Sequence, residues 1–298
     1  MYYLVFRATA LWLRNPTTLQ LTLKTHEVII QPGRAERHYW RDLWRNRELM
    51  YILSMRDVSV RYKQTALGMT WGLIRPLMTM LIMVLVFSNI AKLPPDPGVP
   101  YPLMVLGGIT VWTFFATAFT QISNSVTLNS NLVTKVYFPR LIMPISAVAV
   151  SFIDFLVSLG LFILMAIWYR FVPDWHLLFV PVFMVLTVLA AFAFGLFFAV
   201  VNVRFRDIGQ LIPFLVQIGF YACPIAYSSR LVANEWYYDL YIINPMVGII
   251  DGFRWALLGG KAYFNPQSLL TSVIIVAVSL SLSLYFFRKR ESTFVDDI

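Results

Sequence analysis

The chain has 298 residues, of which 59% are hydrophobic and only 13% are charged. A soluble domain of this length needs far more charge to cover its surface, so the composition excludes that class and predicts an all-α polytopic membrane protein. The formal charge of +9 does not indicate nucleic-acid binding, because the basic residues gather in the N-terminal region, two short loops and the C-terminal tail. That distribution is typical of the cytoplasmic loops of membrane proteins.

Residues 1–67 are predicted to form a cytoplasmic N-terminal region. Residues 1–13 are largely apolar, but Arg7 interrupts them and no small-residue cleavage site follows, so we expect no cleaved signal peptide. The role of residues 1–30 stays open. Trp40 and Trp44 lie among arginines, where indole rings favour the headgroup region and guanidinium groups favour lipid phosphates. This pattern predicts an anchor at the membrane surface.

The stretch from Arg56 to Pro76 joins this region to the first apolar span. Read as a helix, its apolar face consists of Met55, Val58, Tyr62 and Ala66. The opposite, mostly basic face consists of Arg56, Asp57, Arg61, Lys63 and Gln64. The spacing of Asp57 and Arg61 predicts an ion pair. We expect an amphipathic interface helix on the cytoplasmic membrane surface, with an ordinary polar flank of the next helix as the alternative.

Six apolar segments follow, each near the roughly 20 residues that a helix needs to cross a bilayer. They lie at about 71–90, 103–122, 141–168, 177–203, 208–226 and 269–287. Residues 68–290 are therefore predicted to form one transmembrane domain, and residues 291–298 a cytoplasmic tail.

Loop charge orients these spans. The N-terminal region, the tail and the loops with Lys135, Arg140, Arg204 and Arg206 fall on one side. The other side carries Lys92, Arg170, Arg230, Arg254 and Lys261. Because cytoplasmic loops are enriched in lysine and arginine, both termini are predicted to be cytoplasmic and the number of spans even.

The connection at 228–267 is the longest on the extracytoplasmic side. It contains the apolar but short sequence NPMVGIIDGFRWALLGG, which carries Asp251 and Arg254. A seventh span there would place the basic tail outside. A re-entrant helical hairpin before the last span fits the length and the charges better.

No motif for catalysis is found in the sequence. There is no GxxxxGK[ST] phosphate-binding loop, no paired-carboxylate motif and no GxSxG. The single cysteine, Cys223, excludes an intrachain disulfide and a cysteine-based metal cluster. We expect a transport subunit without a catalytic residue, a metal site or a bound cofactor.

Asp154 is the only acid deep within a predicted span, and no neighbouring span offers it a basic partner. An intramembrane carboxylate is a candidate for a functional role such as proton transfer. A local hydrogen bond or a wet cavity is the alternative.

Aromatic residues are the next signal, because sugar rings stack on aromatic faces and a channel for long glycans would use such a lining. The channel candidates are Trp71, Trp112, Phe220, Tyr221 and Tyr227. A further group with Trp236, Tyr237 and Tyr238 lies outside the spans. The alternative for both groups is the aromatic belt common to membrane proteins.

The loop after the second span becomes steadily more polar from Ser123 onward. Asn131 is expected to cap a short helix that Pro139 closes. Such a compact cytoplasmic helix can insert into a groove of a partner protein; a simple turn is the alternative.

Four motifs together resemble a known family. They are RDVSVRYKQTALGMTWGLIRP, NLVTKVYFPRLIMP, VNVRFRDI and NP…GFRWALLG, spread in the same order from Tyr39 to Arg290. This arrangement is similar to that of permease subunits of ABC exporters for bacterial surface polysaccharides, the O-antigen and teichoic-acid export group.

The resemblance implies a half-transporter of the cytoplasmic (inner) membrane that pairs with a second copy of itself. It also implies two copies of a separate ATPase subunit, which would bind the ATP and magnesium. The implied substrate is a glycan on an undecaprenyl pyrophosphate-type lipid, and no nucleic acid is expected as a partner.

The resemblance also implies roles for particular residues. The entrance for the lipid phosphates would consist of Arg56, Arg61, Lys63 and Arg75. The coupling helix to the ATPase would consist of Asn131, Leu132, Val133, Thr134, Lys135, Val136, Tyr137, Phe138, Pro139 and Arg140. The extracytoplasmic gate would include Trp236, Tyr237, Tyr238, Arg254 and Trp255.

Three alternatives stay open at this stage. The first is an ABC exporter of another cargo, such as teichoic acid or a small drug-like molecule. The second is a proton-driven secondary transporter, which predicts internal repeats and several intramembrane ionisable groups. The third is a membrane glycosyltransferase, which needs acidic residues on cytoplasmic loops, where only Asp207 is available.

Overall fold

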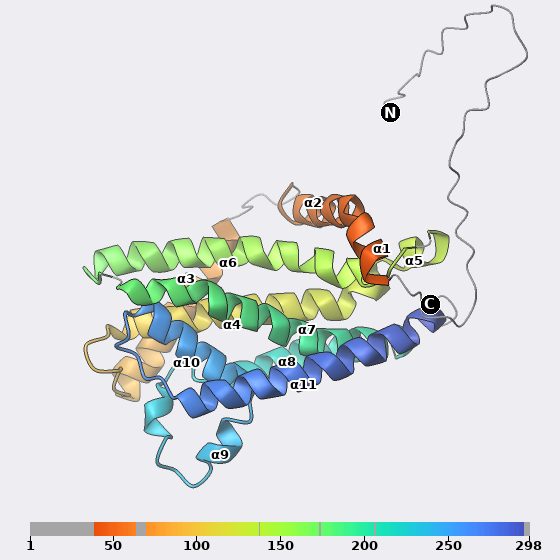
Figure 1. Cartoon of the computed structure of the whole chain (residues 1–298). Helices are drawn as coiled ribbons and strands as arrows, with labels where there is room; N and C mark the ends of the chain where they lie inside the picture. Colours follow the sequence, from red (N-terminus) through yellow and green to blue (C-terminus); the bar gives the residue numbers. More distant parts are fainter. Residues whose placement is uncertain (1–38, 64–69, 137, 173, 206, 295–298) are drawn as a thin grey trace, which may run out of the picture. The chain divides into compact units, whose positions relative to one another are not determined.

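The computed structural model describes residues 39–63, 70–136, 138–172, 174–205 and 207–294. The predictions for residues 1–38, Gln64 and Ala66, Tyr137, Arg206 and the last four residues lie outside this part of the chain. The described residues are mostly helical and contain no strand (Figure 1).

Five of the described helical segments are long and apolar enough to cross a membrane, which confirms an all-α polytopic membrane protein. The first, Thr70–Ile90, joins α3 (Thr70–Met83) to a π-helical turn, η1 (Val84–Ile90). The next two are α4 (Tyr101–Leu128) and α6 (Ile142–Trp168). The fourth joins η2 (Trp175–Phe179) to α7 (Val180–Arg204). The fifth is α11 (Pro266–Arg290), which continues into η4 (Glu291–Thr293).

The predicted second span was too short at its C-terminal end. Helix α4 continues to Leu128, although its last turns are polar. Their side chains bond to carbonyls of the preceding turn: the Asn124 amide donates to the Thr120 oxygen at 2.9 Å, and the Ser125 hydroxyl to the Ile122 oxygen at 2.7 Å. Such local bonds let polar residues remain in a helix.

The predicted span at 208–226 corresponds to α8 (Ile208–Ala222), which has only 15 residues. It ends there because Pro224 disfavours helical dihedrals at Cys223, whose backbone is extended. At 1.5 Å per residue the helix is about 22 Å long, which is less than a bilayer core. A six-span count is therefore not confirmed by helix length.

Helix α8 runs antiparallel to α4 despite its length. At its start, Gly209 faces the side chain of Asn124, near the end of α4. Just after its end, the backbone of Ile225 lies against Gly108, and the Tyr101 hydroxyl donates to the carbonyl oxygen of Ala226. Residues 208–226 thus extend along almost the whole of α4.

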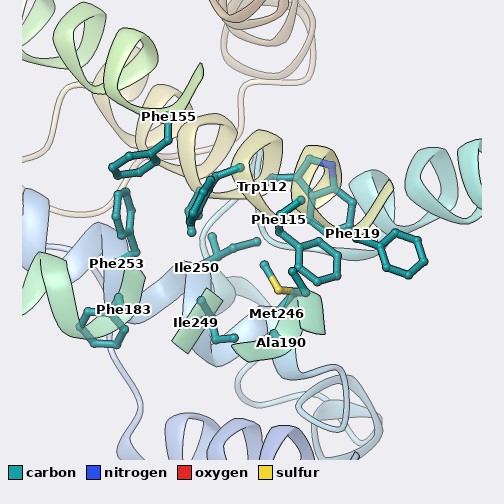
Figure 2. Packing of buried hydrophobic residues seen from close by; sticks show 14 of the residues in the cluster. Trp112, Phe115, Phe119, Phe155, Phe183, Ala190, Met246, Ile249, Ile250 and Phe253 are labelled. Atoms are coloured by element: carbon teal, nitrogen blue, oxygen red, sulfur yellow. The ribbon is translucent and has the colours of Figure 1, made fainter. Parts of the chain in front are cut away.

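The hydrophobic core is built around α4. In an apolar 18-residue stretch of α4, 78% of the residues are buried. In the corresponding stretches of Thr70–Ile90 and Pro266–Thr293, only 17% are buried. Figure 2 shows Trp112, Phe115 and Phe119 of α4 among side chains of α6, α7 and α10. The Phe155 ring of α6 meets Phe253 of α10 edge to face, with centroids 6.0 Å apart.

The predicted extracytoplasmic hairpin contains a short 3-10 helix, η3 (Ser229–Leu231), and two α-helices, α9 (Tyr238–Tyr241) and α10 (Pro245–Leu257). Every residue of α10 except Trp255 is buried. Three contacts set its place: Gly248 packs on Ser268 of α11, Gly252 on Phe183 of α7, and Gly107 of α4 on Arg254. Each of these partners lies in the first two turns of its helix, so α10 lies at the end of the bundle where these helices begin.

The N-terminal helices are α1 (Tyr39–Arg45) and α2 (Arg47–Lys63), and α2 packs on α6. A helix therefore covers most of the predicted interface segment, and its place at the membrane surface stays a prediction. Its packed face differs from the predicted one, because Leu53 is buried whereas Met55 is exposed. The Ser54 hydroxyl donates to the Ser146 carbonyl at 3.4 Å and joins α2 to the start of α6.

Two sets of loop contacts define the ends of the bundle. At what we call the α5 end, Glu291 after α11 accepts from the Tyr39 hydroxyl at 3.2 Å and from the Arg140 amide at 2.5 Å. At the α10 end, Asp96 accepts from Ser228 and from the Tyr263 amide. This grouping of loops agrees with the one predicted from their charges.

We expect Gly248→Ala to lower the free energy of unfolding by about 1–3 kcal/mol, as overpacking of a core does. An added Cβ would lie 2.5 Å from the Ser268 carbonyl oxygen, which is backbone and cannot rotate away. Thermal unfolding of the detergent-solubilised protein measures the loss. Gly160→Ala is the matched control, because no other group lies within 4 Å of its added Cβ; equal destabilisation by both variants would contradict the packing of α10.

Candidate functional site

An ion pair between α2 and α6 is the centre of the candidate site. Nη2 of Arg61 lies 2.6 Å from Oδ2 of Asp154, and the Tyr62 hydroxyl donates to Oδ1 of the same carboxylate at 2.6 Å. Asp154 therefore has a basic partner, although not from a neighbouring span. The partner comes from a helix outside the spans, so a search of neighbouring spans could not find it.

The predicted ion pair between Asp57 and Arg61 is wrong. Asp57 instead accepts from its neighbour Arg56, at 2.7 Å from Nη2. The same Arg56 nitrogen donates to Oδ1 of Asn129 at 2.7 Å, which connects α2 to the end of α4. Helical spacing places Asp57 and Arg61 on one side of α2, but the more buried carboxylate of Asp154 takes the Arg61 guanidinium.

The Tyr62 phenol is suited to its role as a donor. Burial, and next the hydrogen bond to Asp154, raise the pKa of Tyr62 above its ordinary value because both disfavour the phenolate. The hydroxyl therefore keeps its proton at neutral pH, and the Asp154 carboxylate receives one cation and one neutral donor.

Two cavities meet at this ion pair. The larger, of about 710 Å³, lies toward the α5 end, and the smaller, of about 240 Å³, lies farther along α4. Arg61 and Thr117 line both. The polar and charged side chains of the larger cavity are Arg56, Asp57, Arg61, Thr117, Thr120, Gln121, Ser125 and Asn129. Those of the smaller are Arg61, Tyr62, Arg75, Thr113, Thr117, Asp154 and Ser158.

Three of the four predicted entrance residues therefore share these cavities. Arg56 lines the larger one, Arg75 the smaller one, and Arg61 both. The Arg75 guanidinium lies 5.9 Å from the ring centroid of Trp71, which also lines the smaller cavity. Lys63, at the exposed end of α2, lines neither cavity.

The predicted channel aromatics lie in different surroundings. Trp71 and Tyr221 are exposed, whereas Phe220 and Tyr227 are half-buried. Trp112 is buried: its ring packs against Phe115 and Phe220, and Gly219 of α8 allows this close approach. Trp112 thus joins α4 to α8, while the exposed rings remain available for a ligand.

One of the predicted gate residues, Arg254, forms a second ion pair, at the α10 end. Nη2 of Arg254 lies 2.6 Å from Oδ1 of Asp251, and both side chains are at most 1% exposed. Nη1 of Arg254 also donates to the Tyr227 carbonyl at 3.1 Å, which holds the segment after α8 against α10. Sequence reasoning placed both residues in the hairpin but did not pair them.

The aromatic gate residues lie on different parts of the same end. Trp236 is 90% exposed, and Tyr237 meets its ring edge to face. Tyr238 is buried and accepts from the Asn265 amide at 2.8 Å. The Trp255 ring packs on Phe264, His176 and Phe179.

The predicted coupling helix is shorter than its ten residues. Helix α5 (Ser130–Lys135) follows Asn129, so Asn131 lies inside the helix and does not cap it. It ends four residues before Pro139, which instead precedes α6. Val133 is buried, whereas the exposed side chains are Asn131, Thr134, Lys135 and Val136. Exposed and short, α5 can be contacted by another protein.

A family comparison covers most of these elements. The profile of the ABC-2 type transporter family matches residues 48–258, from α2 to the residue after α10. The chain belongs to this family of transporter membrane proteins. This confirms the predicted class of an ABC transporter permease.

Curated relatives agree with this assignment. The chain is 26% identical over 260 residues to the O-antigen export system permease protein RfbA of Myxococcus xanthus, covering 87% of this chain and 98% of that protein. It is 25% identical over 253 residues to the RfbA permease of Klebsiella pneumoniae, covering 84% and 94%. It is also 25% identical over 218 residues to the inner membrane transport permease YadH of Escherichia coli K12, covering 69% and 81%.

The two kinds of ion pair predict different costs of mutation. Asp251→Ala leaves Arg254 buried without its carboxylate, and we expect a loss of about 3–5 kcal/mol in stability. Asp57→Ala removes an exposed pair and should cost at most about 1 kcal/mol. Thermal unfolding in detergent compares the two, and similar losses would contradict the burial of the Asp251–Arg254 pair.

Proposed function

We propose that this chain is the permease subunit of an ATP-driven exporter that moves a lipid-linked, O-antigen-like polysaccharide across the cytoplasmic membrane. Family membership supports the transporter class, and the names of the RfbA relatives support the cargo. The observation that carries the proposal is the arginine-lined pair of cavities beside α2. Arginine binds phosphate oxygens through charge-assisted hydrogen bonds, so this surface suits the phosphates of a lipid carrier.

In this proposal the chain crosses the membrane six times. Helix α8 together with residues 223–227 supplies the crossing that α8 is too short to make alone, since this segment follows α4 from Asn124 to Tyr101. The α5 end is then cytoplasmic, with both termini there, as loop charge predicts. Helix α10 is a re-entrant segment that enters and leaves on the extracytoplasmic side; its irregular flanks are shielded by protein.

The transport channel would form between two copies of the chain. Helices α3 and α8 are the candidates for its lining, because few of their residues are buried by the rest of the chain. Trp71 and Tyr221 are the exposed aromatic residues among the predicted lining. Stacking on such rings would guide the sugar chain without a single dominant binding site.

A separate ATPase subunit would bind ATP and magnesium and press on α5. Arg140, four residues after Val136, is bonded to Glu291 at the end of α11, and Tyr39 of α1 shares that carboxylate. Movement of α5 would therefore reach α1, α6 and α11 together. Arg56, Arg61 and Arg75 would hold the lipid phosphates at the cytoplasmic leaflet while the glycan enters.

The ATPase contact can be tested at the exposed residues of α5. We expect Lys135→Glu with Val136→Asp to abolish co-purification with the ATPase partner, because a groove that accepts α5 would meet two new negative charges. Arg230→Glu, an exposed change at the α10 end, serves as the control and should leave the complex intact. Failure of the unmodified chain to bind any ATPase would overturn the proposal.

The entrance can be tested by charge reversal. We expect Arg75→Glu to reduce export at least about tenfold, a change of about 1.4 kcal/mol, because a carboxylate in the smaller cavity repels phosphate. Lipid-linked glycan should then accumulate on the cytoplasmic side, which mass spectrometry of extracted lipids measures. Lys63→Glu, outside both cavities, is the matched control and should have a smaller effect. Normal export by the Arg75 variant, with unchanged topology, would contradict the entrance.

A further inference from the structure

The Asp154 carboxylate is paired with the Arg61 guanidinium, which the proposed entrance needs to bind its ligand. Both carboxylate oxygens are engaged, Oδ2 by Arg61 and Oδ1 by Tyr62, each at 2.6 Å. The two side chains differ in access, since Asp154 is 14% exposed and Arg61 is 34% exposed. Arg61 therefore faces both cavities while it holds an internal anion.

We propose that Asp154 is an internal substitute for the phosphate of the substrate. This inference rests on the proposed function and assigns Asp154 as a residue that positions Arg61 and sets its selectivity. In the empty permease Asp154 keeps the Arg61 charge paired. When a polyprenyl diphosphate enters, its oxygens replace the carboxylate at the guanidinium.

Exchange of one anion for another explains why the pair suits an entrance. A partly buried arginine without a partner would pay a desolvation cost. If both side chains of the pair were fully buried, an outside anion could not reach the arginine to replace the carboxylate. Here the arginine side is open to the 710 Å³ cavity. The released carboxylate keeps the Tyr62 hydroxyl and shares the smaller cavity with the hydroxyls of Thr117 and Ser158.

The exchange also predicts selectivity for charge. Every anion must displace the same carboxylate, so loss of the Asp154–Arg61 interaction is one fixed cost. A diphosphate has more charge and more acceptor oxygens than a monophosphate with which to offset that cost. Asp154 thus weakens the binding of every anion and sets a threshold that weakly bound anions do not reach. Release of Arg61 would at the same time loosen the last turn of α2 from α6, which links occupation of the entrance to movement of the interface helix.

The test is binding of farnesyl diphosphate to the full-length permease in nanodiscs by isothermal titration calorimetry, with farnesol as the uncharged control. We expect Asp154→Asn to bind farnesyl diphosphate about tenfold more tightly than the unmodified chain, which corresponds to about 1.4 kcal/mol. Asp154→Glu keeps the charge and should retain the weaker affinity. Arg61→Gln should bind at least about tenfold more weakly than the unmodified chain.

The outcomes separate this inference from the proposed function. If Arg61→Gln weakens binding but Asp154→Asn leaves it unchanged or weaker, the entrance stands and the role of Asp154 is wrong. If Arg61→Gln has no effect, the phosphate entrance itself fails at this residue. Binding of farnesyl monophosphate that is measurable in Asp154→Asn but not in the unmodified chain supports the threshold, and monophosphate binding of equal affinity in both overturns it.

A second measurement avoids substitution of Asp154, in case that variant does not fold. Spin labels at the exposed positions of Ser59→Cys on α2 and Leu156→Cys on α6 report the distance between the two helices. We expect farnesyl diphosphate to shift that distance distribution and farnesol to leave it unchanged. An identical distribution with both ligands would overturn displacement of Asp154.

Discussion

A charge placed in apolar surroundings must have a partner, and this constraint fixes the positions of two helices, α2 and α10. Near the middle of the long apolar helix α6, Asp154 is matched by Arg61 from α2, which holds α2 beside the bundle. At the α10 end, Asp251 and Arg254 neutralise each other within one helix, so α10 can be almost wholly buried. Without these pairs neither α2 nor α10 could lie where it does, because desolvation of a lone charge costs several kcal/mol.

The two pairs differ in burial, and that difference has a functional meaning. The Asp251–Arg254 pair is closed to solvent and bonded to the backbone at Tyr227, which suits a fixed structural role. The Arg61–Asp154 pair opens onto two cavities, so an outside anion can compete for its cation. Helix α4 forms the buried centre on which α6, α7, α8 and α10 all pack. A rigid centre lets changes at α2 or α5 be passed on as movements of whole helices.

Much of the fold could be predicted from local sequence because the bilayer imposes a length and a polarity on each span. The segments at 71–90 and 141–168 agree with Thr70–Ile90 and Ile142–Trp168 within a few residues. Errors arose where a local feature overrode hydropathy. Side-chain bonds to the backbone extended α4 to Leu128, and Pro224 ended α8 at Ala222.

The candidate site was harder to predict, because its pairs depend on tertiary packing. Helical spacing favoured a bond between Asp57 and Arg61, but spacing within one helix carries no information about a carboxylate on another. Conversely, Trp112 was predicted to line the channel, yet its ring is buried in the core against Gly219. A sequence shows which aromatic and charged residues are present, and only the packing of helices decides which of them stay accessible.

The central claim is that this chain carries a lipid-linked glycan across a membrane when its ATPase partner hydrolyses ATP. Its most direct test is transport by the purified permease–ATPase complex in proteoliposomes that contain lipid-linked oligosaccharide on the ATP-accessible side. A membrane-impermeant glycosidase reports how much glycan remains on that side. The account predicts ATP-dependent protection of the glycan. Glycan that stays fully accessible while ATP is hydrolysed would contradict it.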